Sequence, residues 1–156
     1  MRPLTVITLA ILLAACDSKP VASEAPKAAP AAAPKPSDES RRFPKDDQIG
    51  SVVVDKELLG KPFMPGGTLV KYRKGKAGYD MFAAKMANPA EAALILPDWR
   101  KALTDPKLVP SFGAYYGLDA GRPVFVFSKG PWIAGIAGLS QKDADAAARK
   151  LAAALD

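Results

Sequence analysis

The chain has 156 residues, with 22 Lys or Arg against 16 Asp or Glu, one cysteine and no histidine. This length allows one ordinary domain. The single cysteine excludes a disulfide within one copy, and the lack of histidine removes the usual acid or base at neutral pH. From Phe43 onward, sixteen basic and twelve acidic residues leave a net charge of +4. No basic stripe interleaved with aromatic residues is present, so the sequence predicts no nucleic-acid partner.

The N-terminus is built like a secretory signal. Arg2 precedes an apolar run from Leu4 to Leu13, and two small residues then lead to the only cysteine, in the stretch Leu13-Ala14-Ala15-Cys16. The run is too short for a transmembrane helix, which needs about 20 residues. The stretch resembles the signal of a bacterial lipoprotein. The resemblance implies that residues 1–15 are a signal peptide and that Cys16 carries the lipid.

The resemblance also implies a location. Acyl chains on Cys16 would hold the protein at a bacterial membrane, since each buried methylene contributes about 0.8 kcal/mol and two chains give stable anchoring. Asp17 follows the cysteine directly, and in enteric lipoproteins an aspartate at this place resembles an inner-membrane retention signal. We therefore expect an inner-membrane protein that faces the periplasm, in preference to an outer-membrane one.

A tether is predicted between the signal and the part that folds. Residues 16–42 are rich in proline and alanine, whereas all aromatic residues lie at or after Phe43. A segment of that composition cannot bury enough apolar surface to offset the entropy lost on ordering. The sequence therefore predicts a disordered tether over 16–42 and one globular domain over 43–156. A chain that starts near Phe43 is expected to melt like one that starts at Asp17.

The first half of the domain predicts three strands. Ile49 to Asp55 is rich in valine and favours a strand. Lys61 to Gly67 contains two prolines and paired glycines, which argue against regular structure there. Thr68 to Arg73 and Tyr79 to Met86 flank a glycine-containing turn and predict an antiparallel hairpin.

A helix is predicted after the hairpin. Asn88 is a good N-cap, Pro89 suits the first helical position, and Glu91 lies three residues after the cap. Pro97 lacks the N–H that a helix needs and clashes with the preceding turn. The helix is therefore expected to stop or kink near Leu96.

The second half predicts three strands joined by glycine-containing turns, over Ser111–Leu118, Arg122–Ser128 and Trp132–Leu139. Ser140 then caps a last helix. One face of this helix carries a narrow apolar stripe, made of Ala144, Ala147, Ala148, Leu151 and Leu155. Gly135 and Gly138 lack side chains and are expected to let this helix approach the sheet.

Strands and helices are segregated along the chain, which favours an antiparallel sheet. The predicted fold is α+β, a small sheet made of a hairpin and a three-stranded meander, with two helices packed on one face. Its outline is similar to small extracytoplasmic domains of bacterial lipoproteins, and this resemblance implies an architecture without an activity.

The sequence offers little catalytic chemistry. Histidine is absent, and the only cysteine is assigned to the lipid, so no thiol nucleophile remains. Asp80, Asp98 and Asp119 could form a site only if the fold brought them together, and Asp98 and Asp119 are more simply explained as cap and turn residues. We therefore predict a protein that is not an enzyme and that needs no metal or cofactor.

Two groups of residues are candidates for binding. The aromatic residues Tyr115, Tyr116, Trp132 and Trp99 either belong to the core or form an exposed patch that contacts a partner or ligand. The basic residues Lys71, Arg73, Lys74 and Lys76 either form a solvated hairpin tip or contact an anionic lipid surface.

Three functions remain open. The first is a lipid-anchored module of the bacterial envelope that binds or assembles with an envelope protein. The second is a carrier of a small ligand or lipid, with an apolar pocket between sheet and helices. The third and weakest is a hydrolase based on carboxylates. A closed pocket lined by Phe and Leu would favour the carrier, and a filled core with an exposed aromatic patch would favour the module.

Overall fold

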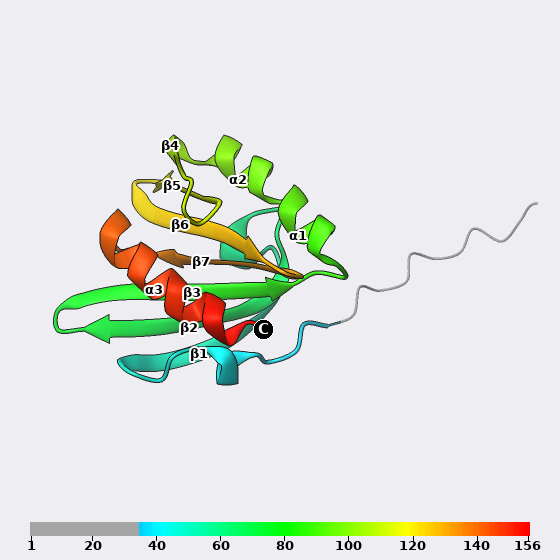
Figure 1. Ribbon diagram of the computed structural model, residues 1–156. Coiled ribbons are helices and arrows are strands. Elements are labelled where there is room, and N and C mark those ends of the chain that lie inside the picture. The colour runs from blue at the N-terminus through cyan, green and yellow to red at the C-terminus, as the bar shows by residue number, and fades with distance from the viewer. Residues whose placement is uncertain (1–34) are drawn as a thin grey trace, which may run out of the picture. The chain divides into compact units, whose positions relative to one another are not determined.

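The computed structural model describes residues 35–156. The predicted signal peptide, Cys16, Asp17 and the tether up to residue 34 lie outside the described residues. The strands, in chain order, are β1 (Gln48–Lys56), β2 (Pro65–Lys74), β3 (Ala77–Lys85), β4 (Thr104–Val109), β5 (Ala114–Asp119), β6 (Arg122–Lys129) and β7 (Trp132–Ala137). They form one seven-stranded antiparallel sheet in the order β1-β2-β3-β7-β6-β5-β4 (Figure 1).

Within residues 35–156, the helices comprise two short 3₁₀ turns, η1 (Ser40–Arg42) and η2 (Leu58–Gly60), and three α-helices, α1 (Pro89–Leu94), α2 (Leu96–Ala102) and α3 (Gln141–Ala154). The predicted helix starts are confirmed. Asn88 Oδ1 accepts a hydrogen bond from the Glu91 N–H at 2.9 Å, and Ser140 Oγ accepts one from the Asp143 N–H at 3.3 Å. The expected break is also confirmed, because Ile95 separates α1 from α2.

The fold class α+β is confirmed, but the helices cover both faces of the sheet, so the prediction of two helices on one face is wrong. Successive residues of β3 belong to different cores, Met81 to the core under α3 and Phe82 to the core under α1 and α2. Phe125 and Val126 of β6 alternate in the same way. Because side chains in a strand alternate between faces, the two cores lie on opposite sides of the central strands.

The sheet is also larger than a hairpin and a meander. β1 extends the hairpin into a three-stranded unit, and β4 (Thr104–Val109) was not predicted at all. Pro106 stands within β4, and proline is tolerated in a sheet at an edge or a bulge. β4 has both features, since it is the last strand of the sheet and its register shifts between Thr104 and Lys107.

Two expectations about glycines are corrected. The Pro65-Gly66-Gly67 stretch was expected to be irregular, but it forms the start of β2 and pairs with β1. Gly135 was expected to make room for the last helix, but a Cβ there would lie 2.5 Å from Phe82 Cζ. Phe82 belongs to the core on the opposite face from α3, so Gly135 accommodates an aromatic ring. Gly138 has a φ of +101° and lies beside the Arg122 side chain, not beneath the helix.

The residues before Phe43 are part of the folded unit. The Glu39 N–H donates to Thr68 Oγ1 at 3.0 Å, and this hydroxyl donates to the Ser37 carbonyl at 3.4 Å. Thr68 lies in β2 and is fully buried. Residues 37–39 therefore cover β2 on the face that α3 occupies.

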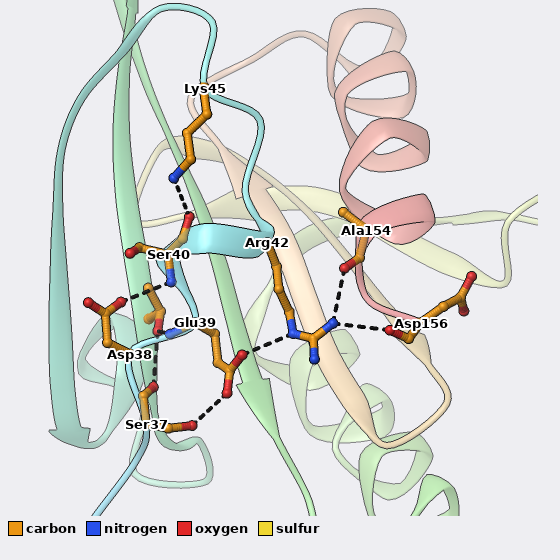
Figure 2. A network of polar contacts seen from close by, with 9 residues as sticks. Ser37, Asp38, Glu39, Ser40, Arg42, Lys45, Ala154 and Asp156 are labelled. Carbon is orange, nitrogen blue, oxygen red and sulfur yellow. Dashed lines mark hydrogen bonds and ion pairs between the residues drawn. The ribbon is translucent and has the colours of Figure 1, made fainter.

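Arg42 continues this connection to the end of the chain. Its guanidinium pairs with Glu39 at 2.9 Å and donates to the carbonyls of Ala154 at 3.4 Å and Asp156 at 3.0 Å (Figure 2). It also lies 5.4 Å from the centre of the Trp132 ring. The segment Ser37–Arg42, which we call the N-terminal clamp, thus joins β2, β7 and the end of α3.

The clamp changes the expectation for shortened chains. A chain that starts at Phe43 should be less stable than one that starts at Lys35 by about 1–2 kcal/mol, because it loses several hydrogen bonds worth about 1 kcal/mol each and regains chain entropy. Calorimetry at pH 7 should show a melting temperature lower by about 4–8 °C. Equal melting temperatures would mean that residues 35–42 do not stabilise the fold. The folded domain would then begin at Phe43, as the composition alone predicts.

Acid should reduce this difference. The hydroxyl of Ser37, and then the Arg42 guanidinium, hold the pKa of Glu39 below its ordinary value of 4.5. Because the pKa is lower in the folded state, the carboxylate stabilises the fold above its ordinary pKa, and this contribution is lost as the pH falls through the folded-state value. The two melting temperatures should therefore converge below pH 4. A constant difference down to pH 3 would show that Glu39 plays no part.

Candidate functional site

The structure places the four candidate aromatic residues in or against the core. Trp99 is fully buried and its indole N–H lies 3.2 Å from Met64 Sδ, while Trp132 is 3% exposed beneath Arg42 and Lys85. We therefore correct the suggestion that the two tryptophans contact a partner.

Tyr115 and Tyr116 are half-buried neighbours in β5, and they pack against the cores on opposite faces of the sheet. The Tyr116 hydroxyl donates to the Leu139 carbonyl at 3.5 Å. The four aromatic side chains are therefore not gathered into one exposed patch.

The four basic candidates do lie together. Lys71, Arg73 and Lys74 end β2, and Lys76 follows in the turn to β3, so the cluster occupies the tip of the β2–β3 hairpin (Figure 1). All four side chains are exposed. Among the described residues, none of the four is in an ion pair, so the tip presents a local positive charge to solvent.

The three candidate carboxylates are each in an ion pair. Asp80 pairs with Arg122 at 2.9 Å, Asp119 with Lys61 at 2.5 Å, and Asp98 with Lys101 at 3.3 Å. Each of the three carboxylates is thus paired with a different cation. Within residues 35–156, no group of three or more potential metal ligands is present.

A groove lies between α3 and the β2–β3 hairpin. Its volume is about 530 Å³, and it is open to solvent. It is lined by Pro44, Asp46, Asp47, Lys74, Ala77, Tyr79, Met81, Leu139, Asp143, Ala146, Ala147 and Lys150. We call this hollow the α3 groove. Lys74 belongs both to the groove and to the basic hairpin tip, so the two features are continuous.

Tyr79 is the central aromatic residue of the α3 groove. Its ring stacks on that of Tyr72 with centres 4.9 Å apart and planes 11° from parallel. The Tyr72 hydroxyl donates to the Pro44 carbonyl at 2.7 Å, which fixes the ring that supports Tyr79. Tyr79 is therefore a half-buried tyrosine, supported by the Tyr72 ring, at the place where the hairpin faces α3.

The electrostatics of the groove are mixed. Burial, followed by the charges of Asp47 and Asp46, raises the pKa of Tyr79, so the phenol stays protonated at neutral pH. Asp143 is held by the Ser140 hydroxyl, which donates to it at 2.6 Å, and Lys74 and Lys150 supply positive charge. The lining of the groove thus combines apolar side chains with charges of both signs.

Two smaller hollows flank Trp132. One, of about 300 Å³, lies between the start of the described chain and β2, and the other, of about 290 Å³, lies beside Pro131 and Leu155. Lys85 lines both. None of these three hollows within residues 35–156 is lined by phenylalanine, so they do not match the closed Phe and Leu pocket that would favour a carrier.

The sequence reasoning missed the residues of the α3 groove. The strand pattern predicts only that Tyr79 and Met81 lie in a strand, and it predicts no role for Asp46 and Asp47. Tyr79 and Met81 are two residues apart in a strand, so their side chains lie on the same face. This spacing predicts that they contribute to one surface. The partner across the groove, α3, lies about sixty residues later in the chain, so its identity was not readable from local pattern.

No helix within the described residues is long and apolar enough to cross a membrane. No protein-family model, no curated protein and no solved structure matches this chain. The function is therefore argued from the residues themselves.

Proposed function

We propose that this protein is a bacterial envelope lipoprotein, anchored through acyl chains on Cys16, whose folded unit binds or assembles with another envelope protein. The proposal rests first on the stretch Leu13-Ala14-Ala15-Cys16, which places the only cysteine directly after an apolar run and two small residues. Asp17 favours retention in the inner membrane, facing the periplasm. Recovery in the outer-membrane fraction of a density gradient would contradict that location.

The α3 groove supports the binding role. Its floor carries Tyr79 and Met81, and its rim carries charges of both signs, the combination typical of a contact surface with an apolar centre and a polar edge. A groove open to solvent gives access to a chain segment, whereas a carrier would need to enclose its ligand. Asp80, Asp98 and Asp119 are each paired with a cation, which gives no support to the hydrolase alternative.

Cys16→Ala is expected to abolish lipidation, because the thiol of Cys16 is the only one in the chain. Metabolic labelling with a fatty-acid analogue should label the parent chain and leave the variant unlabelled, and the variant should accumulate as an uncleaved precursor. A lipid label that persists on the Ala variant would refute the anchor.

Site-specific photo-crosslinking tests the binding role separately. A photoreactive amino acid in place of Lys150, which is exposed on α3 and lines the groove, should yield one discrete adduct in intact membranes. The control is the same amino acid in place of Arg100, which is exposed on α2 on the other face of the sheet. Adding Tyr79→Ala should remove the adduct at Lys150. Equal adducts from both positions, or no effect of Tyr79→Ala, would refute the groove as the contact surface.

A further inference from the structure

β1 is an open edge of the sheet. It pairs only with β2, and within residues 35–156 nothing pairs with its outer side (Figure 1). About half of the backbone N–H and C=O groups of an edge strand point away from its neighbour and can pair with another strand. Ile49 is 56% exposed and Val52 is 46% exposed, so apolar side chains accompany these free backbone groups.

The opposite edge is protected and β1 is not. β4 contains Pro106, a residue with a positive φ of 50° at Asp105, and a bulge between Thr104 and Lys107. Prolines, bulges and edge lysines are the features by which proteins prevent edge-to-edge pairing. β1 has no proline, its only irregularity lies between Gln48 and Gly50, and its centre is Val52-Val53-Val54. The two edges therefore differ in their capacity to accept a strand.

We propose that β1 pairs antiparallel with β1 of a second copy of this chain, about a two-fold axis at Val53. This register places Val53 opposite Val53 of the other copy, and Val52 opposite Val54. It also places Asp55 opposite Ser51 and Lys56 opposite Gly50, so no like charges face each other. Moving the axis by one residue either way replaces valine pairs with contacts to serine, glycine or charged residues. The strand is thus most complementary to itself in one register.

The geometry of the pair places both N-terminal clamps on one side of the sheet. The two-fold axis of antiparallel edge strands runs perpendicular to the sheet, so both copies turn the same face to the same side. Val53 pairs with Thr68, and Thr68 is covered by the N-terminal clamp. Both copies therefore place Ser37–Arg42 on one face of the continuous sheet. The pairing does not depend on the lipid anchor, although anchoring would raise the effective concentration of the copies.

A second copy fits the edge better than the chain's own N-terminal part. Residues 17–34 include four prolines, and proline lacks the N–H that a strand ladder needs. A strand from an unrelated protein would need no particular sequence in β1, and so would not account for the valine register. The self-complementary sequence of β1 favours the second copy.

Cysteine crosslinking in the full-length protein tests the pairing. Val53→Cys places a thiol at the axis, and facing residues of an antiparallel pair lie 4.5–5.5 Å apart at Cα, within reach of a disulfide. The matched control is Leu108→Cys, which is 57% exposed on β4 at the other edge. A mild oxidant in native membranes should crosslink Val53→Cys at least about tenfold faster than Leu108→Cys, because pairing raises the effective concentration of the facing thiols. Crosslinking of the parent chain, whose only cysteine is Cys16, measures any contribution of that residue to the crosslinked product.

A second variant makes the outcome independent of the thiol. Val52→Lys should leave the fold intact, since this side chain is half exposed, and should weaken dimerisation at least about tenfold by placing charge beside the pairing strand. Sedimentation in density-matched detergent measures the dimer. Equal crosslinking at Val53 and Leu108, or a parent chain that sediments as a monomer, would overturn the proposal. So would protection of β1 amides from hydrogen exchange without a Val53 crosslink, because another strand would then occupy the edge.

Discussion

Replacing Gly135 with alanine is expected to lower the free energy of unfolding by about 3 kcal/mol or more, at the upper end of the usual cost of overpacking. A Cβ at this position would lie 2.3 Å from the Phe125 carbonyl oxygen and 2.5 Å from Phe82 Cζ. The carbonyl belongs to β6, which is paired on both sides, so the backbone cannot retreat. The Phe82 ring is fully buried and packs against Trp99, with ring centres 5.9 Å apart. It therefore has no free space into which it could move away from an added Cβ.

Gly50→Ala is the matched control for this prediction. Gly50 also lies in a strand, its φ is not in the left-handed region, and a Cβ there would meet nothing within 4 Å. Urea unfolding of the two variants should show a large loss of stability for Gly135→Ala and a change within about 0.5 kcal/mol for Gly50→Ala. Similar stabilities of the two variants would mean that Phe82 does not pack closely against Gly135.

Local features of the fold could be predicted from sequence because each depends on a few neighbouring residues. The Asn88 and Ser140 caps use a side chain and an N–H three residues apart, and the break before Pro97 follows from its missing N–H. The apolar stripe of α3 was also predicted correctly, since Ala144, Ala148 and Leu151 are all buried.

The predicted layer arrangement was wrong, although the sequence contains a signal for helices on both faces of the sheet. The central strands contain continuous apolar runs, such as Val124–Phe127 and Ile133–Ala137, and these runs are buried throughout. Alternation of apolar and polar residues indicates one buried face, whereas a continuous run indicates burial on both faces. The runs therefore predicted a helix layer on each side of the sheet.

Other features could not be read from local sequence. β4 carries Pro106, which usually argues against a strand, and only its place at the edge permits it. The N-terminal clamp lacks large apolar side chains and is held by hydrogen bonds to residues about thirty and more than a hundred positions away. The α3 groove likewise joins Asp47, Tyr79 and Lys150 from three separate segments. Contacts between segments this far apart in the sequence depend on the topology of the whole sheet, so local sequence patterns do not predict them.

Removal of α3, from Ser140 to the C-terminus, is expected to abolish cooperative folding. Leu151 and Leu155 are buried against β6 and β7, and their core also includes Phe125, Phe127 and Ile136. Burial of each large apolar side chain contributes about 1.5–3 kcal/mol. Deletion loses two leucines, two buried alanines and the cover of several strand residues, a loss comparable with the 5–15 kcal/mol total stability of a small domain. Calorimetry of the shortened chain should show no cooperative unfolding transition.

A graded variant makes this prediction quantitative. Leu151→Ala should cost about 2–5 kcal/mol, because Leu151 is fully buried and its truncation leaves a cavity. Lys142→Ala, on the exposed side of the same helix, should change stability by less than about 0.5 kcal/mol. If Leu151→Ala melted like Lys142→Ala, or if the chain without α3 still unfolded cooperatively at the parent temperature, the core beneath α3 would not hold this face of the sheet. The two-sided layering would then be wrong, since β6 and β7 bury their side chains on both faces only when a helix covers each.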